Sequence, residues 1–554
     1  MNLTIFLLFY IIITASIIGY GLLFQNILKK SVAIELEYNL LGGLLFLIFL
    51  SFLTHFFLNH GYIHNTIILI FGTSFFVFYF FKNKKIFKKY FKYIFLIFGI
   101  LTIALLAAKT HDDFPYYHFP YTYYLTQENL IIGVGSLVHA FRTPSSIFYL
   151  NSLFYLPIIE YFLFNMGAIL IFAFSNLILI FKIKNDYYNK QYDFVFFLSL
   201  LSFLFINIFF YRIAEHGTDR SAQILIFILF IEVFGLYRKS TNVEKIFSKI
   251  FILLGLIISL KAFYVLYLII LLPLLFQFKK YKSFINFFSN FYFYIFCFIG
   301  LFLMLVNIFN SGCVLYPVSI TCLPNLDWSL FNEAKSSNDW YEQWAKAGAG
   351  PNHRVEDPIN YIKGFNWVTN WIELYFFNKV SDFLLSLFFL LVIVSFTFYS
   401  KNRINIKIKK QYYIIYLLII VLFLEWFYNH PSLRYGGFSL LALIMFVPFS
   451  IYISKFVPTK FFKKKIIFLM IVSLLLFVGR NIHRINNEVE KYDYNVITYP
   501  YYYLDEVNFR VDRIVNNIQV NHQNCINKGK INCKGFEEIF VTKKSIYYIL
   551  KKNK

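Results

Sequence analysis

The sequence predicts an all-α polytopic membrane protein. Of its 554 residues, 59% are hydrophobic and 22% are aromatic, and the mean hydropathy is +0.61. Soluble domains are only roughly 45–50% apolar. Apolar stretches recur from end to end, and each is long enough to cross a hydrocarbon layer about 30 Å thick, so we expect about 14 transmembrane helices.

The expected spans follow the apolar stretches in order. They are residues 3–25, 38–58, 65–82, 92–109, 158–181, 193–211, 220–237, 249–260, 262–277, 284–309, 380–400, 412–428, 436–454 and 466–479. The eighth and ninth form one apolar block that Lys261 interrupts. Basic residues flank both ends of this block, which favours a short hairpin turning at Lys261 over a single crossing.

Charge and the N-terminal sequence exclude two other interpretations. The net charge of +23 comes from Lys and Arg scattered in short loops between apolar runs, so we expect membrane lipids as partners and no nucleic acid. The run Leu3–Gln25 lacks a basic leader and a small-residue cleavage site, which indicates a retained helix.

The positive-inside rule orients the spans. The loop "KNKKIFKKYFK" (82–92) is the strongest cytoplasmic marker, and it places 26–37, 182–192, 238–248, 278–283, 401–411 and 455–465 on the same side. The short loops 59–64, 212–219 and 429–435, which carry few basic residues, then lie outside with the longer segments 110–157, 310–379 and 480–554. We therefore expect a multi-pass protein of a bacterial inner membrane, with its site facing the periplasm.

The cysteines agree with this orientation. Four of the five lie in the outer segments as two close pairs, Cys313 with Cys322 and Cys525 with Cys533. Disulfides persist in oxidising compartments, so both pairs are expected to be oxidised in a periplasm. The cysteine and histidine spacing does not indicate a structural zinc site.

The chain divides into a membrane domain, 1–479, and a C-terminal segment, 480–554. The membrane domain contains the two large outer loops, 110–157 and 310–379. Within the first loop, 121–140 and 145–157 are aromatic and apolar enough to predict helices that lie along the membrane surface. The C-terminal segment is too mixed in composition for disorder and too short for a large core, which indicates a small extracytoplasmic α/β cap.

Ionisable residues gather on the predicted outer face. Charged groups at membrane depth are costly, so they are treated as functional candidates. An Asp at a helix end can also be a simple cap, an Arg can reach to lipid headgroups, and His118 and His216 are expected to be hydrogen-bonded neighbours before metal ligands. The candidates are His111, Asp112, Asp113, His118, Glu215, His216, Asp219, Arg220, Lys261, Glu425, His430 and Arg434.

The stretch "HDDFPYYHFP" (111–120) resembles the acidic motif in the first outer loop of GT-C membrane glycosyltransferases, in particular the arabinosyl- and mannosyltransferase-like branch. The resemblance is specific over about 110–124 and architectural over roughly 90–310. It implies transfer of a sugar from a polyprenyl-phosphate-linked donor to a glycan or lipid acceptor in cell-envelope polysaccharide synthesis.

The residues fit that chemistry. A carboxylate activates an acceptor hydroxyl as general base, a role for Asp113 with Asp112 as its partner. Cations stabilise the departing phosphate, a role for Lys261, Arg220 and Arg434. His111, His118, Glu215, His216, Asp219 and His430 complete the predicted substrate site. No cofactor is predicted, and a divalent metal is left as an alternative.

Two other functions stay open at this point. An O-antigen-type polymerase or ligase would use the same lipid-linked substrates through outer-loop arginines, here Arg142, Arg354 and Arg434. A transporter would need ionisable residues near mid-membrane and often an internal repeat. The sequence specifies neither the sugar nor the acceptor.

Overall fold

The structure is a computed structural model. It describes residues 2–27, 34–82, 84–107, 113–214, 217–238, 242–275, 287–350, 355–405 and 408–498, together with 516, 519–521, 523, 539–544 and 547–552 near the C-terminus.

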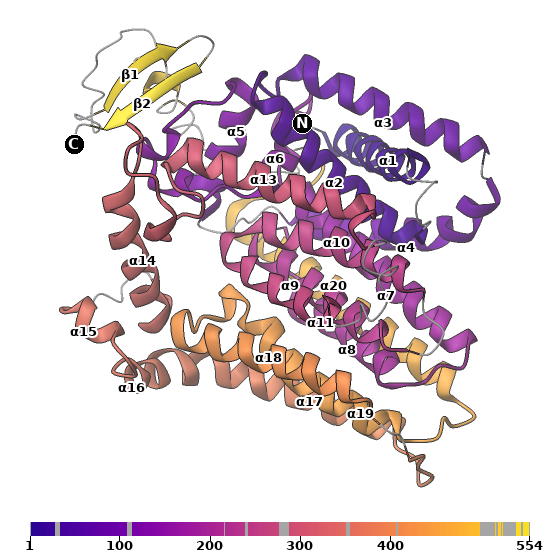
Figure 1. Cartoon of the computed structure of the whole chain (residues 1–554). Coiled ribbons are helices and arrows are strands. Elements are labelled where there is room, and N and C mark those ends of the chain that lie inside the picture. Colours follow the sequence, from indigo (N-terminus) through magenta and orange to yellow (C-terminus); the bar gives the residue numbers. More distant parts are fainter. Residues whose placement is uncertain are drawn as a thin grey trace.

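Long apolar helices make up most of the described chain (Figure 1). Within the described residues, ten helical stretches are long and apolar enough to cross a membrane, so the protein is an all-α, multi-pass membrane protein in outline. The long helices are α1 (Leu3–Ile27), α2 (Leu36–His55), α3 (Tyr62–Lys82), α4 (Lys84–Leu106), α7 (Met166–Tyr188), α13 (Phe291–Ser311), α17 (Ser381–Phe398), α18 (Lys410–Asn429), α19 (Gly437–Ser454) and α20 (Phe462–Tyr492).

Shorter helices fill the centre of the bundle and the outer segments. Those of the bundle are α8 (Phe194–Phe209), α9 (Asp219–Gly235), α10 (Val243–Leu260) and α11 (Leu271–Leu275). Those of the outer segments are α5 (Phe119–Gln127), α6 (Ser146–Ser152), α14 (Phe331–Lys346), α15 (Pro358–Ile362) and α16 (Val368–Trp371), the last of which runs through a π-helical stretch, Ile372–Val380, into α17.

Helix α9 lies at the centre of the bundle. It contacts α7, α8, α10 and α19, and all of its residues except Arg220 are buried. Because protein surrounds this helix, the charged groups near its two ends, Asp219 and Glu232, meet other protein side chains instead of lipid. The core therefore positions charges at both ends of one helix.

Close approach between helices depends on small residues. A Cβ atom on Gly19 of α1 would lie 1.9 Å from the carbonyl oxygen of Gly72 in α3, so a larger residue at Gly19 would force these helices apart. Helices without a hydrophobic driving force between them commonly pack at such small residues. Figure 1 shows α1 lying beside α2 and α3 at the edge of the bundle.

The loops separate into two ends of the bundle. At one end, hydrogen bonds connect segments that are far apart in sequence. These bonds join Leu3 to Ile497, Tyr494 to Leu106, His60 to Leu125 and Ser145 to Leu260. The other end is joined by the pairs Lys249–Glu35, Lys182–Glu232 and Arg238–Asp186, and by a bond from Lys409 to the carbonyl of Tyr237. These two ends contain the loops that charge assigned to the outer and the inner face, respectively.

The chain reverses direction at Lys261, as the sequence predicts. Helix α10 ends at Leu260, and a 3₁₀ segment, Ala262–Ile270, leads into α11. The hydroxyl of Tyr237, which precedes α10, donates to the carbonyl of Pro273 in α11 at 3.2 Å. The segment after Lys261 therefore returns to the end from which α10 started.

The first outer loop differs from the prediction. Its helices α5 and α6 are shorter than expected and are enclosed by protein: all seven residues of α6 are buried, and α6 contacts α2, α5, α7 and α10. The prediction of surface-lying helices over 121–140 and 145–157 is therefore wrong. Residues 158–165, expected to open a span, form turns, and α7 begins only at Met166.

The C-terminal segment begins within a helix. α20 continues through Arg480, the predicted start of the cap, to Tyr492. Near the C-terminus, β1 (Ile539–Lys544) and β2 (Tyr547–Lys552) form an antiparallel hairpin. The amide of Leu550 in β2 donates to the carbonyl of Ile132 at 2.8 Å, so this hairpin packs against the first outer loop beside α5 (Figure 1).

Candidate functional site

Two carboxylates and two cations meet at the predicted outer end of the bundle. Asp219 pairs with both Lys261 and Arg434, and Arg434 also pairs with Asp113. The four come from four separate parts of the chain: the segment after α4, the start of α9, the break after α10 and the loop between α18 and α19. We call these four residues the outer charge cluster. All four were predicted from sequence as site residues.

Asp219 forms the buried centre of this cluster. One carboxylate oxygen binds the Lys261 ammonium, and the other accepts from Nε of Arg434 at 2.5 Å. Burial alone would raise the pKa of this carboxyl, but the attraction of Lys261 and Arg434 outweighs it, and the pKa lies below its usual value. Its place in the first turn of α9, at the positive end of the helix dipole, also favours the anion. Asp219 is therefore an ionised anchor for both cations.

The loop that carries Arg434 is fixed by aromatic side chains. The indole of Trp371 donates to the carbonyl of Pro431 and the indole of Trp426 donates to that of Ser432, both at 2.8 Å. The hydroxyl of Tyr375 accepts from the amide of Leu433 at 2.9 Å. These three hydrogen bonds hold the backbone directly before Arg434, so its guanidinium extends from a fixed loop.

Gln223 connects this loop to α9. It lies one turn after Asp219 on the same helix face, donates to the carbonyl of Arg434 at 3.1 Å and accepts from the amide of Ser439 at 3.1 Å. Gly436 adopts a left-handed conformation (φ 106°) between Arg434 and the start of α19, which a side chain would strain. The turn and the helix are thus positioned as one unit.

Lys261 occupies the break between α10 and the 3₁₀ segment. Its ammonium lies 4.3 Å from the ring centroid of Tyr435, a cation–π distance, and pairs with Asp219. Burial and the neighbouring Arg434 lower the pKa of this ammonium, while Asp219 opposes that change. Asp219 is therefore the partner that the charge of Lys261 requires within its apolar block.

Asp113 lies at the more open edge of the cluster. Its side chain is 29% exposed, whereas that of Asp219 is 3% exposed. It pairs with Nη2 of Arg434, which also lies 3.4 Å from the hydroxyl of Tyr117. A carboxylate in this position remains accessible to a ligand that approaches Arg434 from the outer face.

Three other predicted residues lie near the cluster but differ in how they face it. His118 packs among the rings of Phe114, Tyr117 and Phe148 and lines a small cavity beside Thr218, so it lies behind the cluster.

His430 borders the cluster through aromatic rings. Its imidazole lies edge-on to the rings of Phe263 and Tyr435. The Tyr435 ring is also the one that makes the cation–π contact with Lys261. Burial, with the nearby Lys346 and Lys261, lowers the pKa of this imidazole to about 4, so it is neutral at ordinary pH. Among the described residues, its Nδ1 is buried and has no hydrogen-bond partner.

Arg220 points away from the cluster. Its guanidinium donates to the carbonyl of Arg212 at 2.8 Å and lies 5.9 Å from the ring of Phe210. Arg220 is next to Asp219 in sequence, but the helix turns its side chain toward the loop before α9. Its role as a phosphate-binding cation stays a prediction. Glu425 lies on α18 and accepts a hydrogen bond from Asn429 at 3.0 Å.

Several predicted site residues lie outside the described part of the chain. These are His111, Asp112, Glu215, His216, Arg354, Cys525 and Cys533. Within the described residues, no group of three or more His, Cys, Asp or Glu side chains is arranged to hold a metal ion.

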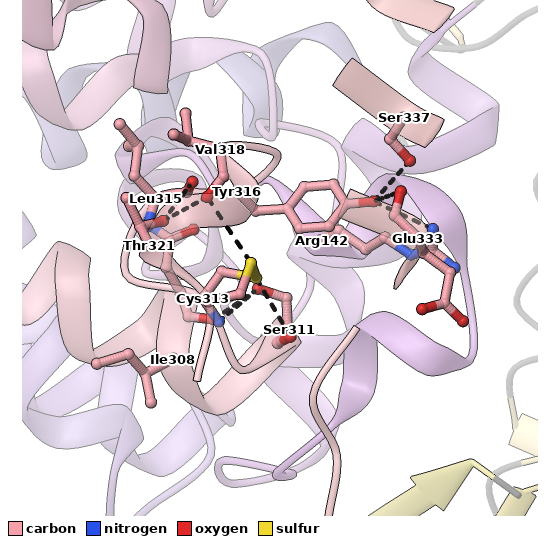
Figure 2. Close-up of a disulfide and its surroundings, with 12 residues drawn as sticks. Arg142, Ile308, Ser311, Cys313, Leu315, Tyr316, Val318, Thr321, Glu333 and Ser337 are labelled. Atoms are coloured by element: carbon pink, nitrogen blue, oxygen red, sulfur yellow. Dashed lines mark hydrogen bonds between the residues drawn. A yellow bond between two sulfur atoms is a disulfide. The ribbon is translucent and has the colours of Figure 1, made fainter. Parts of the chain in front are cut away.

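The predicted Cys313–Cys322 disulfide is present in the structure. It closes a turn directly after α13, where Gly312 ends the helix in a left-handed conformation. Figure 2 shows Tyr316 extending from this turn toward Ser337 and Glu333 of α14, with Arg142 alongside. The disulfide therefore supports the start of the second large outer loop.

Sequence reasoning missed a second group of charges at the opposite end of α9. Glu232 binds Lys182, lies 3.7 Å from Lys249 and accepts from the hydroxyl of Tyr38 at 2.7 Å. Lys249 in turn pairs with Glu35 at 2.9 Å. We call Glu35, Lys182, Glu232 and Lys249 the inner charge cluster. A single Glu in the apolar run "LIFILFIEVFG" was the signal that would have revealed it.

The outer charge cluster can bind an anion without losing its internal pairs. Lysine and arginine offer three and five donors, respectively. In the described part of the chain, the hydrogen bonds of Arg434 use Nε and Nη2, which leaves the donors of Nη1, and Lys261 bonds one carboxylate oxygen. The two side chains are 24% and 26% exposed. Phosphate oxygens are suitable acceptors for such donors.

Comparisons with known proteins place the chain in a family. No curated protein and no solved structure matches it. The family model described as a domain of unknown function (DUF8201) matches residues 1–441 of the 554. The matched part contains the whole outer charge cluster and ends early in α19. The chain therefore belongs to the DUF8201 family.

Proposed function

We propose that the protein is a membrane glycosyltransferase that moves a sugar from a polyprenyl-phosphate-linked donor to a glycan or lipid acceptor. The convergence of Asp113, Asp219, Lys261 and Arg434 at one end of the bundle carries this proposal. A lipid-linked donor approaches from the membrane, so a site at the end of a helix bundle suits it. The resemblance of "HDDFPYYHFP" to GT-C enzymes supports the same reaction.

Lys261 and Arg434 would bind the donor phosphate. Both carry positive charge at the mouth of the cluster, and Asp219 fixes their directions. Preorganised cations lower the barrier because they stabilise the charge that develops on the leaving phosphate. Asp219, assigned from sequence to substrate binding, is better suited to positioning these cations because it is buried beneath them.

Asp113 would act as the general base. The acceptor hydroxyl oxygen attacks the anomeric carbon, the bond from that carbon to the phosphate oxygen breaks, and polyprenyl phosphate leaves with the electron pair. The hydroxyl proton passes to the Asp113 carboxylate. Its pairing with Arg434 brings this carboxylate next to the donor phosphate. Asp112 would assist from the adjoining position.

The proposed location is a bacterial inner membrane, with the outer charge cluster facing the periplasm. The charge asymmetry of the loops and the Cys313–Cys322 disulfide support this sidedness. The ten long stretches together with α8, α9, α10 and the segment 262–275 would give the 14 crossings expected from sequence. Residues 480–554 would cap the periplasmic face.

A polymerase or ligase is a second candidate, because Arg142 lines an open groove near the cluster and Arg434 belongs to the cluster itself. The two candidates differ in what they require. Arg354→Ala is expected to abolish activity in a polymerase or ligase and to spare a transferase, whereas Asp113→Asn should do the opposite.

Asp113→Asn tests the proposal. The amide keeps the size of the side chain but cannot take the proton, and loss of a general base typically costs about 10²–10⁴-fold in rate. Transfer should be lost while the variant accumulates in the membrane at the level of the wild type. The measurement is mass analysis of cell-surface glycans, with membrane protein quantified in the same cells.

Asp382→Asn is the matched control. Asp382 is an exposed carboxylate in the first turn of α17, so its replacement should leave the glycans unchanged. Normal surface glycans in the Asp113→Asn strain would contradict the proposal and return Asp113 to a structural partner of Arg434.

A further inference from the structure

An open groove of about 490 Å³ lies between the first outer loop and α14. His139 and Arg142 line one wall, and Glu333, Ser336, Ser337 and Trp340 line the other. Its volume lies within the roughly 300–1,000 Å³ that small-molecule sites usually occupy, and its lining combines several polar groups with the aromatic ring of Trp340.

The polar floor of the groove is built by a hydrogen-bond network. Tyr316 donates to the hydroxyl of Ser337 at 2.7 Å, and Nη1 of Arg142 lies 3.2 Å from the Tyr316 oxygen. Nε of Arg142 donates to the carbonyl of Gly135 at 3.0 Å. Figure 2 shows Tyr316 crossing from the disulfide-closed turn to Ser337 and Arg142. The floor is therefore fixed before any ligand binds.

Aromatic rings lead from this groove to the outer charge cluster. Trp340 and Trp344 lie one turn apart on α14, with ring centroids 6.5 Å apart and planes nearly parallel. The ring of Trp344 lies 5.8 Å from that of Tyr435, and the Tyr435 ring makes a cation–π contact with the Lys261 ammonium. The row Trp340, Trp344, Tyr435 thus connects the groove to the cations.

Tyr341 provides a second link between the two places. Its ring lies 6.0 Å from that of His139 in the groove. Burial raises the pKa of this phenol to about 12, with Tyr316 and Asp113 adding to the rise and Arg142 opposing it. Tyr341 therefore packs against the wall of the groove at His139.

We infer that the groove binds the saccharide acceptor and that the row Trp340, Trp344, Tyr435 directs one acceptor hydroxyl toward Asp113. This inference rests on the proposed glycosyltransfer. The carbon face of a sugar ring carries C–H bonds that fit the electron-rich face of an indole. The sugar hydroxyls both donate and accept, as do the mixed donors and acceptors of His139, Arg142, Glu333 and the two serines.

The binding test uses the full-length protein in lipid nanodiscs and short oligosaccharides as probes: maltotetraose, chitotetraose and mannotetraose. Saturation-transfer NMR measures binding of each probe. Trp340→Ala removes the stacking surface, and Ser336→Leu fills the groove from an exposed position on α14. Each change should weaken binding about tenfold or more.

Two matched controls lie on the same helix outside the groove. Phe331 is an exposed aromatic residue and Asn332 an exposed polar residue, and neither lines the groove. Phe331→Ala and Asn332→Leu should bind the probes as the wild type does. Because Trp340 and Ser336 are exposed, their replacement should leave the folded protein intact, which thermal unfolding of each variant checks.

The outcomes separate this inference from the proposed function. If no probe binds the wild type, or if Trp340→Ala and Ser336→Leu bind and support transfer like the wild type while Asp113→Asn does not, the groove is not the acceptor site. If the groove variants lose binding and Asp113→Asn retains normal surface glycans, the saccharide site stands and the assignment of Asp113 fails.

Discussion

The two ends of α9 carry similar charges in different surroundings. In the outer charge cluster, Asp219 pairs with Lys261 and Arg434, and the partly exposed Asp113 adds a second carboxylate. In the inner charge cluster, Glu232 holds Lys182 and Lys249, whose side chains are only 15% and 11% exposed, and Tyr38 closes the remaining side. The two clusters therefore differ in their cations, which are about a quarter exposed in the outer cluster and nearly buried in the inner one.

This difference shows that a buried charge in a membrane protein does not by itself identify a functional site. Both clusters satisfy the general expectation that intramembrane charges are paired. What separates them is the accessibility of the cations: Lys261 and Arg434 are about a quarter exposed, and a groove lined by Trp340 lies nearby, whereas a partly exposed carboxylate occurs in both clusters, as Asp113 and Glu35. The inner cluster joins α2, α7, α9 and α10, so its role is to hold these helices together.

The largest effect on stability is expected for Glu232→Gln. This change leaves Lys182 and Lys249 without their shared carboxylate, and breaking a buried ion pair typically costs about 3–5 kcal/mol. We expect a lower unfolding temperature in detergent and less protein in the membrane, with transfer per folded molecule unchanged. Thermal unfolding and a transfer assay normalised to folded protein measure both quantities.

Glu490→Gln is the control for this variant, because Glu490 is an exposed carboxylate on α20. A Glu232→Gln protein that is as stable as the wild type but inactive would reverse the comparison and make the inner cluster the functional one.

A smaller effect is expected from loss of the disulfide at the outer end. The Cys313–Cys322 bond closes a nine-residue separation, so by chain entropy it contributes about 2–3 kcal/mol. The Cys313→Ser/Cys322→Ser double variant should unfold at a lower temperature. Cys297→Ser, which removes the exposed free cysteine of α13, should not change stability.

The same pair tests which end faces the oxidising compartment. A protein that retains only Cys313 and Cys322 should not react with maleimide in intact cells until a reductant is added. Labelling without reductant would show that the bond does not form in the cell and would remove the main support for a periplasmic outer cluster.

The sequence predicts which residues form the outer charge cluster better than it predicts the contacts of their side chains. Asp113, Asp219, Lys261 and Arg434 were identified because each is an ionisable residue next to an apolar run, and loop charges assign them to one face. Arg220 satisfied the same criterion, but among the described residues its side chain bonds the loop before α9 and not the cluster, because side-chain direction depends on where α9 begins. Partners such as Gln223 depend on tertiary packing, which a single sequence does not encode by pattern.

For the fold too, the sequence predicts the helices but not how protein surrounds each of them. Apolar length gave the helices and the turn at Lys261, because a membrane imposes a fixed span on any sequence. Apolar length did not predict that α6 is enclosed by other helices, since an aromatic, apolar segment such as 145–157 can face either lipid or protein. The groove also escaped prediction, because Arg142 and Trp340 lie in outer segments far apart in sequence, and the contacts that bring these segments together, such as those of Tyr316 with Arg142 and Ser337, depend on tertiary packing.

The smallest effect is expected at His430, at the edge of the outer cluster. Its folded pKa of about 4 lies below the usual value of about 6.5. Between these values the unfolded chain binds the proton and the folded protein does not, so stability is lost as the pH falls from about 6.5 toward 4. His430→Gln removes this titration. The loss of unfolding temperature between pH 7 and pH 5 should therefore be smaller in the variant than in the wild type, whereas an equal loss in both would show that His430 is protonated without cost and does not lie in the buried, cation-rich edge of the cluster.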